Sequence, residues 1–272
     1  MKHLMYNFRT IVSFDQDVTE RYFTLRCLPR ETPFQHILTQ KLTLDPALEW
    51  LGQTDGFGNL LAVGNCRTAH NVFGFTVVGE AEVDISNPRC TDCNALFRYA
   101  SPLTKAGPQL TILFHTEGLG KTPYELMHLV HEKISYVPGV TDIHTTAEEA
   151  LALGKGVCQD KAQVLISLLR MAGFPARYVC GLFVGEGATH AWVEYYFDGI
   201  WYGLDPTHDR AANEDYLVIS YGRDYSDCPI ERGVFRGFAN QNQDVFMQVQ
   251  EIEPRHHGKR EPDGVRLRTE KG

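Results

Sequence analysis

GKGVCQDKAQVLISLLRMAG, residues 154–173, is the stretch that decides the fold of the second half of the chain. After Cys158, apolar residues recur at helical spacing and Gly173 stands where a helix commonly ends, which predicts a helix from Cys158 to about Ala172. A thiol in the first turn lies beside unpaired backbone N–H groups and the positive end of the helix dipole, and both favour the thiolate. Cys158 is therefore a candidate nucleophile, although its position alone fits a buried structural cysteine equally well.

Two shorter helices are predicted upstream from their capping signals. Thr122, Pro123 and Glu125 suit the N-cap, the first and the third helical positions, and the apolar residues that follow predict a helix to about Ser135. The stretch TTAEE at residues 145–149 has the same capping-box spacing and predicts a second short helix.

Downstream of the Cys158 helix, three stretches have the composition of β-strands, namely residues 176–184, 190–197 and 200–204. The dipeptide Asp198-Gly199 separates the last two and is typical of a two-residue type I′ hairpin turn. The sequence therefore predicts an antiparallel hairpin whose register is fixed by its turn.

That register decides which residues of the hairpin lie opposite each other. If Phe197 faces Ile200, then Trp192 lies opposite Asp205, and His190 shares the face of Trp192. His190 is then the diagonal neighbour of Asp205, with the two backbones roughly 7–8 Å apart, so that imidazole and carboxylate can bond. The register thus predicts a base and its orienting carboxylate.

Cys158, His190 and Asp205 have the residue types of a nucleophile, a base and an orienting group. In such an arrangement His190 exchanges a proton with the thiol and Asp205 fixes the imidazole tautomer. The backbone N–H of Cys158 can donate to a developing oxyanion, and Gly156, which has no Cβ, is expected to let a substrate carbonyl approach closely. The register does not predict that the helix packs against the hairpin.

Other polar residues are weaker candidates. His208 and Asp209 are adjacent, and adjacent residues do not share a face of regular structure. His128 and His131 lie three residues apart on a predicted helix, but no third ligand completes a metal site, so a solvated helix face is the favoured interpretation. Four further residues are assigned to the hairpin surface or to the charged tail: Glu194, Asp198, His256 and His257.

The seven cysteines are odd in number and lack the dense spacing of a disulfide framework, which predicts reduced thiols. Cys90 and Cys93 form one Cys-x-x-Cys pair, but no second pair or nearby histidine supplies four zinc ligands. Two thiols in a polar interdomain stretch are the favoured interpretation. We therefore expect no metal and no other cofactor.

The chain has 272 residues, 43% of them hydrophobic, and a formal net charge of −8. This length suits two domains with packed cores. The acidic balance argues against a nucleic-acid partner, because Lys and Arg neutralise most of the phosphate charge in such complexes. No apolar run of about 18 residues could span a membrane, and the first eight residues lack the apolar region of a secretory signal, so the sequence predicts a cytoplasmic protein without a membrane partner.

The first half of the chain is rich in β-signals. Segments between residues 6 and 85 are short, carry many β-branched and aromatic residues, and are separated by turn dipeptides such as Asp45-Pro46 and Asp55-Gly56. They predict an antiparallel β-sandwich or half-barrel of roughly seven strands, followed by a linker over residues 86–109. The predicted division is a β-rich N-terminal domain (1–95), a catalytic domain (96–240), and a C-terminal strand with a charged tail (241–272).

Four motifs occur in an order that resembles the transglutaminase-like superfamily in its bacterial two-domain form. They are GVCQDKA at 156–162, AGFPARYV at 172–179, THAWVE at 189–194 and LDPT at 204–207. Stretches similar to the bacterial branch and to its β-rich N-terminal domain are GRDYSD at 222–227, GVFRG at 233–237, LRCLPR at 25–30 and DGFGN at 55–59.

The resemblance implies an α+β fold, in which an antiparallel β-sandwich-like domain precedes a papain-like core. It also implies Cys158 as nucleophile, His190 as base and Asp205 as orienter, and a thioester intermediate. A peptidase or amidohydrolase acting on a peptide or protein amide is the leading hypothesis, because water is always present as an acceptor. A true transglutaminase is the alternative, and a binding or assembly module with a vestigial triad is a third hypothesis.

The same resemblance implies residues around the triad. Tyr136, or the loop before the Cys158 helix, is expected to supply a second oxyanion donor, and Asp160 to support the helix start. Arg223 and Asp224 are expected to line or brace the site. The residues expected to contact the oxyanion or the substrate are Tyr136, Gly156, Gln159, Trp192, Arg223 and Asp224.

Overall fold

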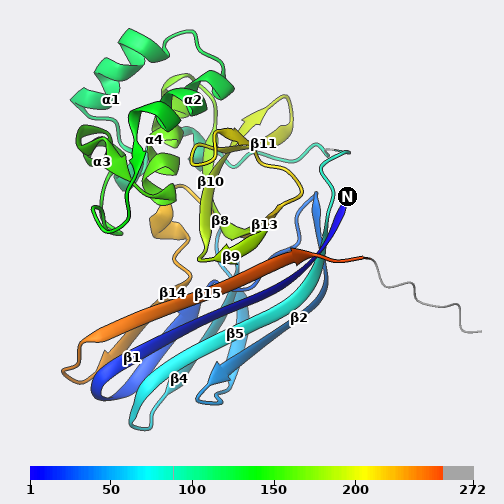
Figure 1. Cartoon of the computed structure of the whole chain (residues 1–272), viewed down its shortest axis with the longest axis vertical. Helices are drawn as coiled ribbons and strands as arrows, with labels where there is room; N and C mark the ends of the chain where they lie inside the picture. The colour runs from blue at the N-terminus through cyan, green and yellow to red at the C-terminus, as the bar shows by residue number, and fades with distance from the viewer. Residues whose placement is uncertain (88, 254–272) are drawn as a thin grey trace, which may run out of the picture.

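The computed structural model describes residues 1–87 and 89–253. Figure 1 shows an elongated sheet that carries the N-terminus, and above it a part in which helices pack beside a smaller sheet. Within the described residues, no helix combines the length and the apolar character needed to cross a membrane. His256, His257 and the predicted charged tail lie outside the described residues.

The larger sheet has eight strands and draws them from both halves of the chain. Its order is β2-β5-β1-β15-β9; β1 also pairs with β14 and β4, and β4 pairs with β3, always antiparallel. The strands are β1 (Lys2–Leu25), β2 (Gln35–Asp45), β3 (Trp50–Thr54), β4 (Leu60–Cys66), β5 (His70–Val83), β9 (Gly185–Gly187), β14 (Glu231–Arg236) and β15 (Gln241–Glu251).

The sheet is built on β1, which is 24 residues long. Its buried side chains alternate with exposed ones from Leu4 to Thr10, so one face of the strand packs into the core. The pairing with β5 shifts register between Ser13 and Val18, and beyond this irregularity β1 pairs with β4 and β14. The predicted half-barrel is confirmed, but residues 6–85 form five strands instead of about seven, because β1 and β5 each run on as one long strand.

The last two strands return from the far end of the sequence to β1. β15 pairs with β1 without a register shift, from Leu4 opposite Glu251 to Phe14 opposite Gln241. β14 pairs with the distal part of β1. The division of the chain at residues 95 and 240 stays a prediction, and the larger sheet takes strands from both sides of the second boundary.

The second part combines helices with a five-stranded antiparallel sheet in the order β12-β11-β10-β8-β13. Apolar residues of α4, including Leu165 and Leu169, share one core cluster with Val193 and Leu204 of that sheet. The main elements are α1 (Pro108–Leu113), α2 (Pro123–Lys133), α3 (Ala147–Leu153), α4 (Cys158–Met171), β8 (Ala176–Phe183), β10 (His190–Phe197), β11 (Ile200–Asp205), β12 (Arg210–Ala211) and β13 (Tyr216–Gly222). The shorter ones are η1 (Ala95–Arg98), η2 (Pro102–Thr104), η3 (Phe114–Gly118), η4 (Tyr225–Asp227), β6 (Ser135–Tyr136) and β7 (Lys155–Gly156).

The three predicted helices begin where the sequence places them. At the start of α2, the Thr122 hydroxyl accepts from the Glu125 N–H, and the Glu125 carboxylate accepts from the Thr122 N–H. The same box forms between Thr146 and Glu149 at the start of α3. α4 begins at Cys158, so the predicted place of the thiol in the first helical turn is confirmed.

Two buried amide side chains attach the larger sheet to the edge strand β13. The Gln35 side chain accepts from the N–H of Val218 at 2.7 Å and donates to its C=O at 2.9 Å. The Asn59 side chain bonds both backbone groups of Tyr221 in the same way, at 2.8 and 2.7 Å. Each amide thus satisfies the open side of an edge strand, where buried unpaired backbone groups would be costly.

We expect Asn59→Ala to lower the free energy of unfolding by about 2–4 kcal/mol, because it leaves the buried N–H and C=O of Tyr221 without partners. Chemical denaturation followed by circular dichroism measures this loss. The matched control is Asn65→Ala, since Asn65 is exposed and its loss should cost less than about 0.5 kcal/mol. Equal denaturation midpoints for the two variants would contradict the attachment role of Asn59.

Candidate active site

The hairpin of β10 and β11 carries two of the predicted site residues. Asp198 and Gly199 have φ angles of 47° and 82°, the left-handed conformations that a type I′ turn requires. Phe197 pairs with Ile200, and the ladder continues from there without a register shift. The hairpin register predicted from the turn is confirmed.

This register brings His190 to Asp205. Nε2 of His190 lies 2.7 Å from Oδ2 of Asp205, and both residues are buried. Burial alone would raise the pKa of Asp205, but the hydrogen bond and charge of His190, with hydrogen bonds from His208 and Tyr216, hold that pKa well below its usual range. Asp205 is therefore a carboxylate at neutral pH.

Two of these partners of Asp205 were not identified from the sequence. Nδ1 of His208 and the hydroxyl of Tyr216 each lie 2.7 Å from the same Oδ2. The backbone N–H groups of Thr207 and His208 donate to Oδ1 at 2.8 and 3.2 Å. The sequence disfavoured His208 because neighbouring residues of a helix or strand do not share a face. That rule does not apply to His208, because β11 ends at Asp205 and the chain then turns back toward the strand. This turn is the signal that could have identified His208.

Cys158 and His190 line the same cavity. Burial alone would lower the pKa of His190, but hydrogen bonds to and electrostatic interactions with Asp205 and Cys158 raise it to about 9. Cys158 is half-buried, whereas Cys180 is buried and its pKa is raised to about 12, first by burial and then by Cys158. Both thiols line the cavity, but of the two only Cys158 is bonded to His190.

The cavity has a volume of about 300 Å³ and walls from both parts of the chain. Cys158 and Gln159 line it from the start of α4, and His190 lines it from the start of β10. The larger sheet contributes Phe8, Thr10, Glu231, Gln243 and Val245. The N-terminal and C-terminal strands therefore form one wall of the candidate site.

Asp160 fixes the backbone that precedes Cys158. Its Oδ2 accepts from the Val157 N–H and from the Thr141 hydroxyl, both at 2.7 Å. A Cβ on Gly156 would lie 2.6 Å from the same oxygen. Asp160 therefore supports the helix start, as expected. The sequence suggested that glycine at position 156 leaves room for a substrate carbonyl, but in the structure glycine is required there because a side chain would collide with the Asp160 carboxylate.

Gln159 and Tyr136, two of the expected contact residues, lie near Cys158. Gln159 lines the cavity. Tyr136 pairs with Gly156 in the parallel pair of β6 and β7, and its pKa is raised by burial and by its electrostatic interaction with Cys158. A role for either residue in binding the oxyanion stays a prediction.

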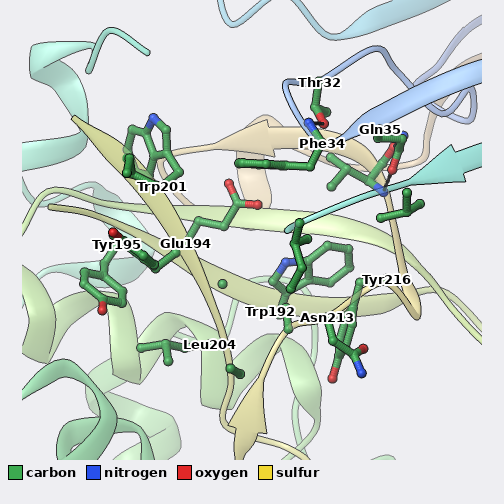
Figure 2. Close-up of a pocket in the computed structure, with 18 of the residues that line it drawn as sticks. Thr32, Phe34, Gln35, Trp192, Glu194, Tyr195, Trp201, Leu204, Asn213 and Tyr216 are labelled. Carbon is green, nitrogen blue, oxygen red and sulfur yellow. Dashed lines mark hydrogen bonds between the residues drawn. The ribbon is translucent and has the colours of Figure 1, made fainter. Parts of the chain in front are cut away.

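Trp192 lies beside the base, but outside the set of residues that line the cavity of Cys158. Its ring stacks on His190, with centroids 6.2 Å apart, and lines a second cavity of about 400 Å³. Figure 2 shows Trp192, Tyr216 and Phe34 around this second, more apolar cavity. Trp192 and Tyr216 thus contact His190 and Asp205 on one side and line the second, apolar cavity on the other.

The prediction that Glu194 lies on the hairpin surface is wrong. β8 runs beside β10 and places Arg177 directly opposite Glu194. The guanidinium of Arg177 contacts the Glu194 carboxylate at 2.6 and 2.7 Å, and Glu194 is buried. Asp198, at the turn, is exposed as expected.

Arg223 and Asp224 hold the segment that carries Tyr225, which does line the cavity. Asp224 is fully buried and accepts from the backbone N–H of Leu103 at 3.3 Å. Arg223 forms an ion pair with Asp227 at 2.8 Å. Neither Arg223 nor Asp224 is among the lining residues, so their contacts favour bracing over substrate contact.

Among the described residues, the one group of three potential metal ligands with atoms within 4.8 Å of one another is His190, Asp205 and His208. Both imidazoles hydrogen-bond the carboxylate in this arrangement. A metal ion here would replace the bonds that orient His190. Cys90, which is exposed, and Cys93 do not belong to this group.

His128 and His131 contact the loop that follows β11, so they are more than a solvated helix face. Nδ1 of His128 lies 2.7 Å from the Asp209 carboxylate, and Nδ1 of His131 lies 3.1 Å from the C=O of Pro206. Helix α2 thereby supports the loop next to Asp205.

Comparison with known proteins identifies the family of the chain. Residues 115–206 match the transglutaminase-like superfamily, and residues 4–82 match the bacterial transglutaminase-like N-terminal region. An uncharacterised protein of Mycobacterium leprae is 36% identical over 127 residues, covering 43% of this chain and 45% of the relative, so the match spans less than half of that protein. An uncharacterised protein of Mycobacterium bovis is 30% identical over 271 residues, covering 83% of this chain and 85% of the relative.

The fold also matches a solved structure. The crystal structure of a proposed cysteine protease from Cytophaga hutchinsonii superposes with a TM-score of 0.74 at 19% identity, covering 93% of this chain and 92% of that one. The predicted α+β fold, a β-rich N-terminal part followed by a transglutaminase-like core, is thereby confirmed. The chain belongs to the transglutaminase-like superfamily, and it carries the bacterial transglutaminase-like N-terminal region ahead of that core.

Proposed function

We propose that the protein is a cysteine-dependent enzyme that cleaves an amide bond of a peptide or protein through a thioester on Cys158. The observation that carries this proposal is the shared cavity of Cys158 and His190, with His190 bound to Asp205 at 2.7 Å. Membership of the superfamily supports cysteine-based acyl transfer as the kind of chemistry. Asp205 serves as the orienting group, and His208 and Tyr216 hold it in place.

In the acylation step, the sulfur of Cys158 attacks the amide carbonyl carbon and the C=O electron pair moves to oxygen. An imidazole with a pKa of about 9 carries a proton at neutral pH, so His190 can give that proton to the leaving nitrogen. The C–N bond then breaks, the amine leaves, and the acyl group stays on sulfur as a thioester.

The oxyanion of this step needs donors close to Cys158. The first N–H groups of a helix have no partner within the helix, and Cys158 is the first residue of α4. Its backbone N–H is the primary donor in this mechanism. Gln159 and Tyr136 are the neighbouring side chains that can add a second hydrogen bond.

In the deacylation step, water attacks the thioester carbonyl, His190 takes its proton, and the C–S bond breaks to release the acid. We favour water as acceptor because polar groups of Thr10, Gln159 and Gln243 line the cavity, and a polar cavity admits water. A transglutaminase, in which an amine replaces water, is the second candidate. A binding module with a vestigial triad is the third.

We also propose a reducing compartment, the cytoplasm, because all seven cysteines are free thiols. A formal net charge of −8 disfavours nucleic acid and anionic membrane surfaces as partners. The substrate is then a soluble peptide or protein.

We expect Cys158→Ala to abolish amide cleavage without loss of the fold, because Cys180, the other thiol that lines the cavity, is buried and has its pKa raised to about 12. Turnover of a peptide library, followed by mass spectrometry, measures activity, and circular dichroism checks the fold. Cys90→Ala is the matched control, since Cys90 is exposed and lies outside the cavity. Retained cleavage in Cys158→Ala would refute the nucleophile assignment.

The same pair of thiols separates an enzyme from a binding module. Iodoacetamide at neutral pH should label Cys158 at least about ten-fold faster than Cys90, because His190 and the helix start favour the thiolate. Equal labelling rates would favour the vestigial triad.

We expect Asp205→Asn to lower kcat/KM by about 10²- to 10⁴-fold, as loss of an orienting carboxylate does in other triads. The charge of Asp205 raises the pKa of His190, so its removal lowers that pKa. Since the leaving amine needs protonated His190, the high-pH limb of kcat/KM, expected near 9 in the native protein, should move to lower pH.

The control for this variant is Asp209→Asn, which changes a neighbouring carboxylate that contacts His128 and not His190. Its pH profile should coincide with that of the native protein. An unmoved high-pH limb in Asp205→Asn would contradict the assignment of that limb to His190.

Hydrolysis and transamidation are distinguished by a labelled primary amine added with a glutamine-containing peptide. We expect release of ammonia with little incorporation of label, because water reaches the thioester directly. Mass spectrometry of the peptide measures both products. Incorporation that exceeds hydrolysis at millimolar amine would establish the transglutaminase alternative.

A further inference from the structure

β15 has an open edge beside the candidate active site. On one side it pairs with β1 along its whole length, from Gln241 to Glu251. On the other side it pairs with β9 over Met247–Val249, and Figure 1 shows the short β9 beside the long β15. Within the described residues, no strand pairs with positions 241–246 on that side.

The hydrogen-bond pattern identifies the backbone groups that face the open side. The N–H of Ile252 donates to the C=O of His3 at 2.8 Å, and the C=O of Asn240 accepts from Asp15 at 3.2 Å. Along an antiparallel strand, residues whose backbone groups bond to one neighbouring strand alternate with residues whose backbone groups point to the opposite side. Even-numbered residues of β15 therefore bond to β1, and the backbone groups of odd-numbered residues point away from it. Three residues therefore present free N–H and C=O groups: Gln241, Gln243 and Val245.

Two of these residues also face the catalytic cavity. The side chains of Gln243 and Val245 line the cavity that contains Cys158 and His190. Thr10, the partner of Val245 on β1, lines the same cavity, and its hydroxyl is buried without a hydrogen-bond partner among the described residues. The unpaired backbone groups of Gln243 and Val245 and the unbonded hydroxyl of Thr10 therefore belong to residues that line the same cavity as Cys158 and His190.

The position of β9 gives the direction of approach. β9 ends at Gly187, opposite Met247 of β15, and the chain reaches His190 three residues later. A strand placed along residues 241–246 of β15 would continue the line of β9 and pass next to His190. Native proteins commonly block such edges with lysine, proline or a bulge. Residues 241–246 read QNQDVF, which contains no lysine or proline and a single charged residue, Asp244, and their pairing with β1 shows no register shift.

We propose that the enzyme takes its substrate as an extended polypeptide that pairs, as an added strand, with Gln241, Gln243 and Val245 of β15. This inference rests on the proposed function. Main-chain hydrogen bonds then supply affinity that is independent of side-chain identity, and the Thr10 hydroxyl bonds a polar group of the bound segment. The substrate class is an unfolded or loop segment of a protein, in contrast to a small amide.

The test uses a tethered peptide in the Cys90→Ser/Cys93→Ser variant. The probe is a nonapeptide of serine, threonine and valine with one central cysteine, activated as its thiopyridyl disulfide. The Cys158 thiolate attacks the cysteine sulfur of the peptide, the thiopyridyl sulfur leaves with the bonding electrons, and a mixed disulfide forms. Hydrogen exchange followed by NMR then reports each backbone amide of β15.

We expect exchange at Gln243 and Val245 to slow by at least about ten-fold on tethering, because their N–H groups gain acceptors. Exchange at Asn242 and Asp244 should stay unchanged, since they already bond to β1. A complete tether without protection at Gln243 and Val245 would overturn the inference and leave the proposed function intact. Protection at these positions that depends on protein concentration without peptide would also overturn it, in favour of a second copy on this edge.

Failure of the tether to form at Cys158 has a different meaning. It would overturn the activated thiol, and with it both the proposed function and the inference that rests on it. Mass spectrometry of the digested protein distinguishes this outcome from the others, since it locates the disulfide.

A proline variant tests the same bonds in turnover. Gln243→Pro removes an N–H on the open side without removing a bond to β1, whereas Gln243→Ala changes the side chain alone. If strand addition contributes to binding, kcat/KM is higher for a ten-residue peptide than for a dipeptide amide. We expect the ratio of these two values to fall at least about ten-fold in Gln243→Pro, and by less than about three-fold in Gln243→Ala. Equal losses in the two variants would assign the effect to the side chain and contradict strand addition.

Discussion

The buried carboxylate of Asp205 is the constraint on which the candidate site depends. A charge without solvent contact is tolerated when several donors surround it, and here Oδ2 is approached by His190, His208 and Tyr216 while backbone N–H groups bond Oδ1. These donors come from β10, from the turn after β11 and from β13. The carboxylate therefore holds β10, the turn after β11 and β13 together.

The second constraint joins the two parts of the chain. Gln35 and Asn59 satisfy the open side of β13, and Tyr216, the first residue of that strand, bonds Asp205. The larger sheet is thus connected to the orienting carboxylate through β13. The same sheet supplies one wall of the cavity around Cys158. The N-terminal region is therefore part of the construction of the candidate site.

The sequence predicted those features that local interactions determine. The Asp198-Gly199 turn fixes a register by itself, so the bond between His190 and Asp205 was predictable, and capping boxes located the helix starts. Long-range pairing leaves no such signal: nothing near Gln241 indicates that β15 pairs with β1, over 200 residues away in the chain. Glu194 was misplaced for the same reason, because its partner Arg177 lies on a strand whose neighbours the sequence did not specify.

The opposing effects on His190 explain why so much structure surrounds one imidazole. Burial beside Trp192 disfavours its charged form, and the contacts with Asp205 and Cys158 outweigh that penalty. Without the carboxylate, an exposed imidazole with a pKa near 6.5 would be mostly neutral at pH 7, and a buried one would be more so. The pairing with Asp205 is therefore what keeps a proton on His190 at neutral pH. That pairing in turn depends on His208, Tyr216 and the backbone N–H groups that stabilise the buried carboxylate, so the imidazole, the carboxylate and its donors act as one unit.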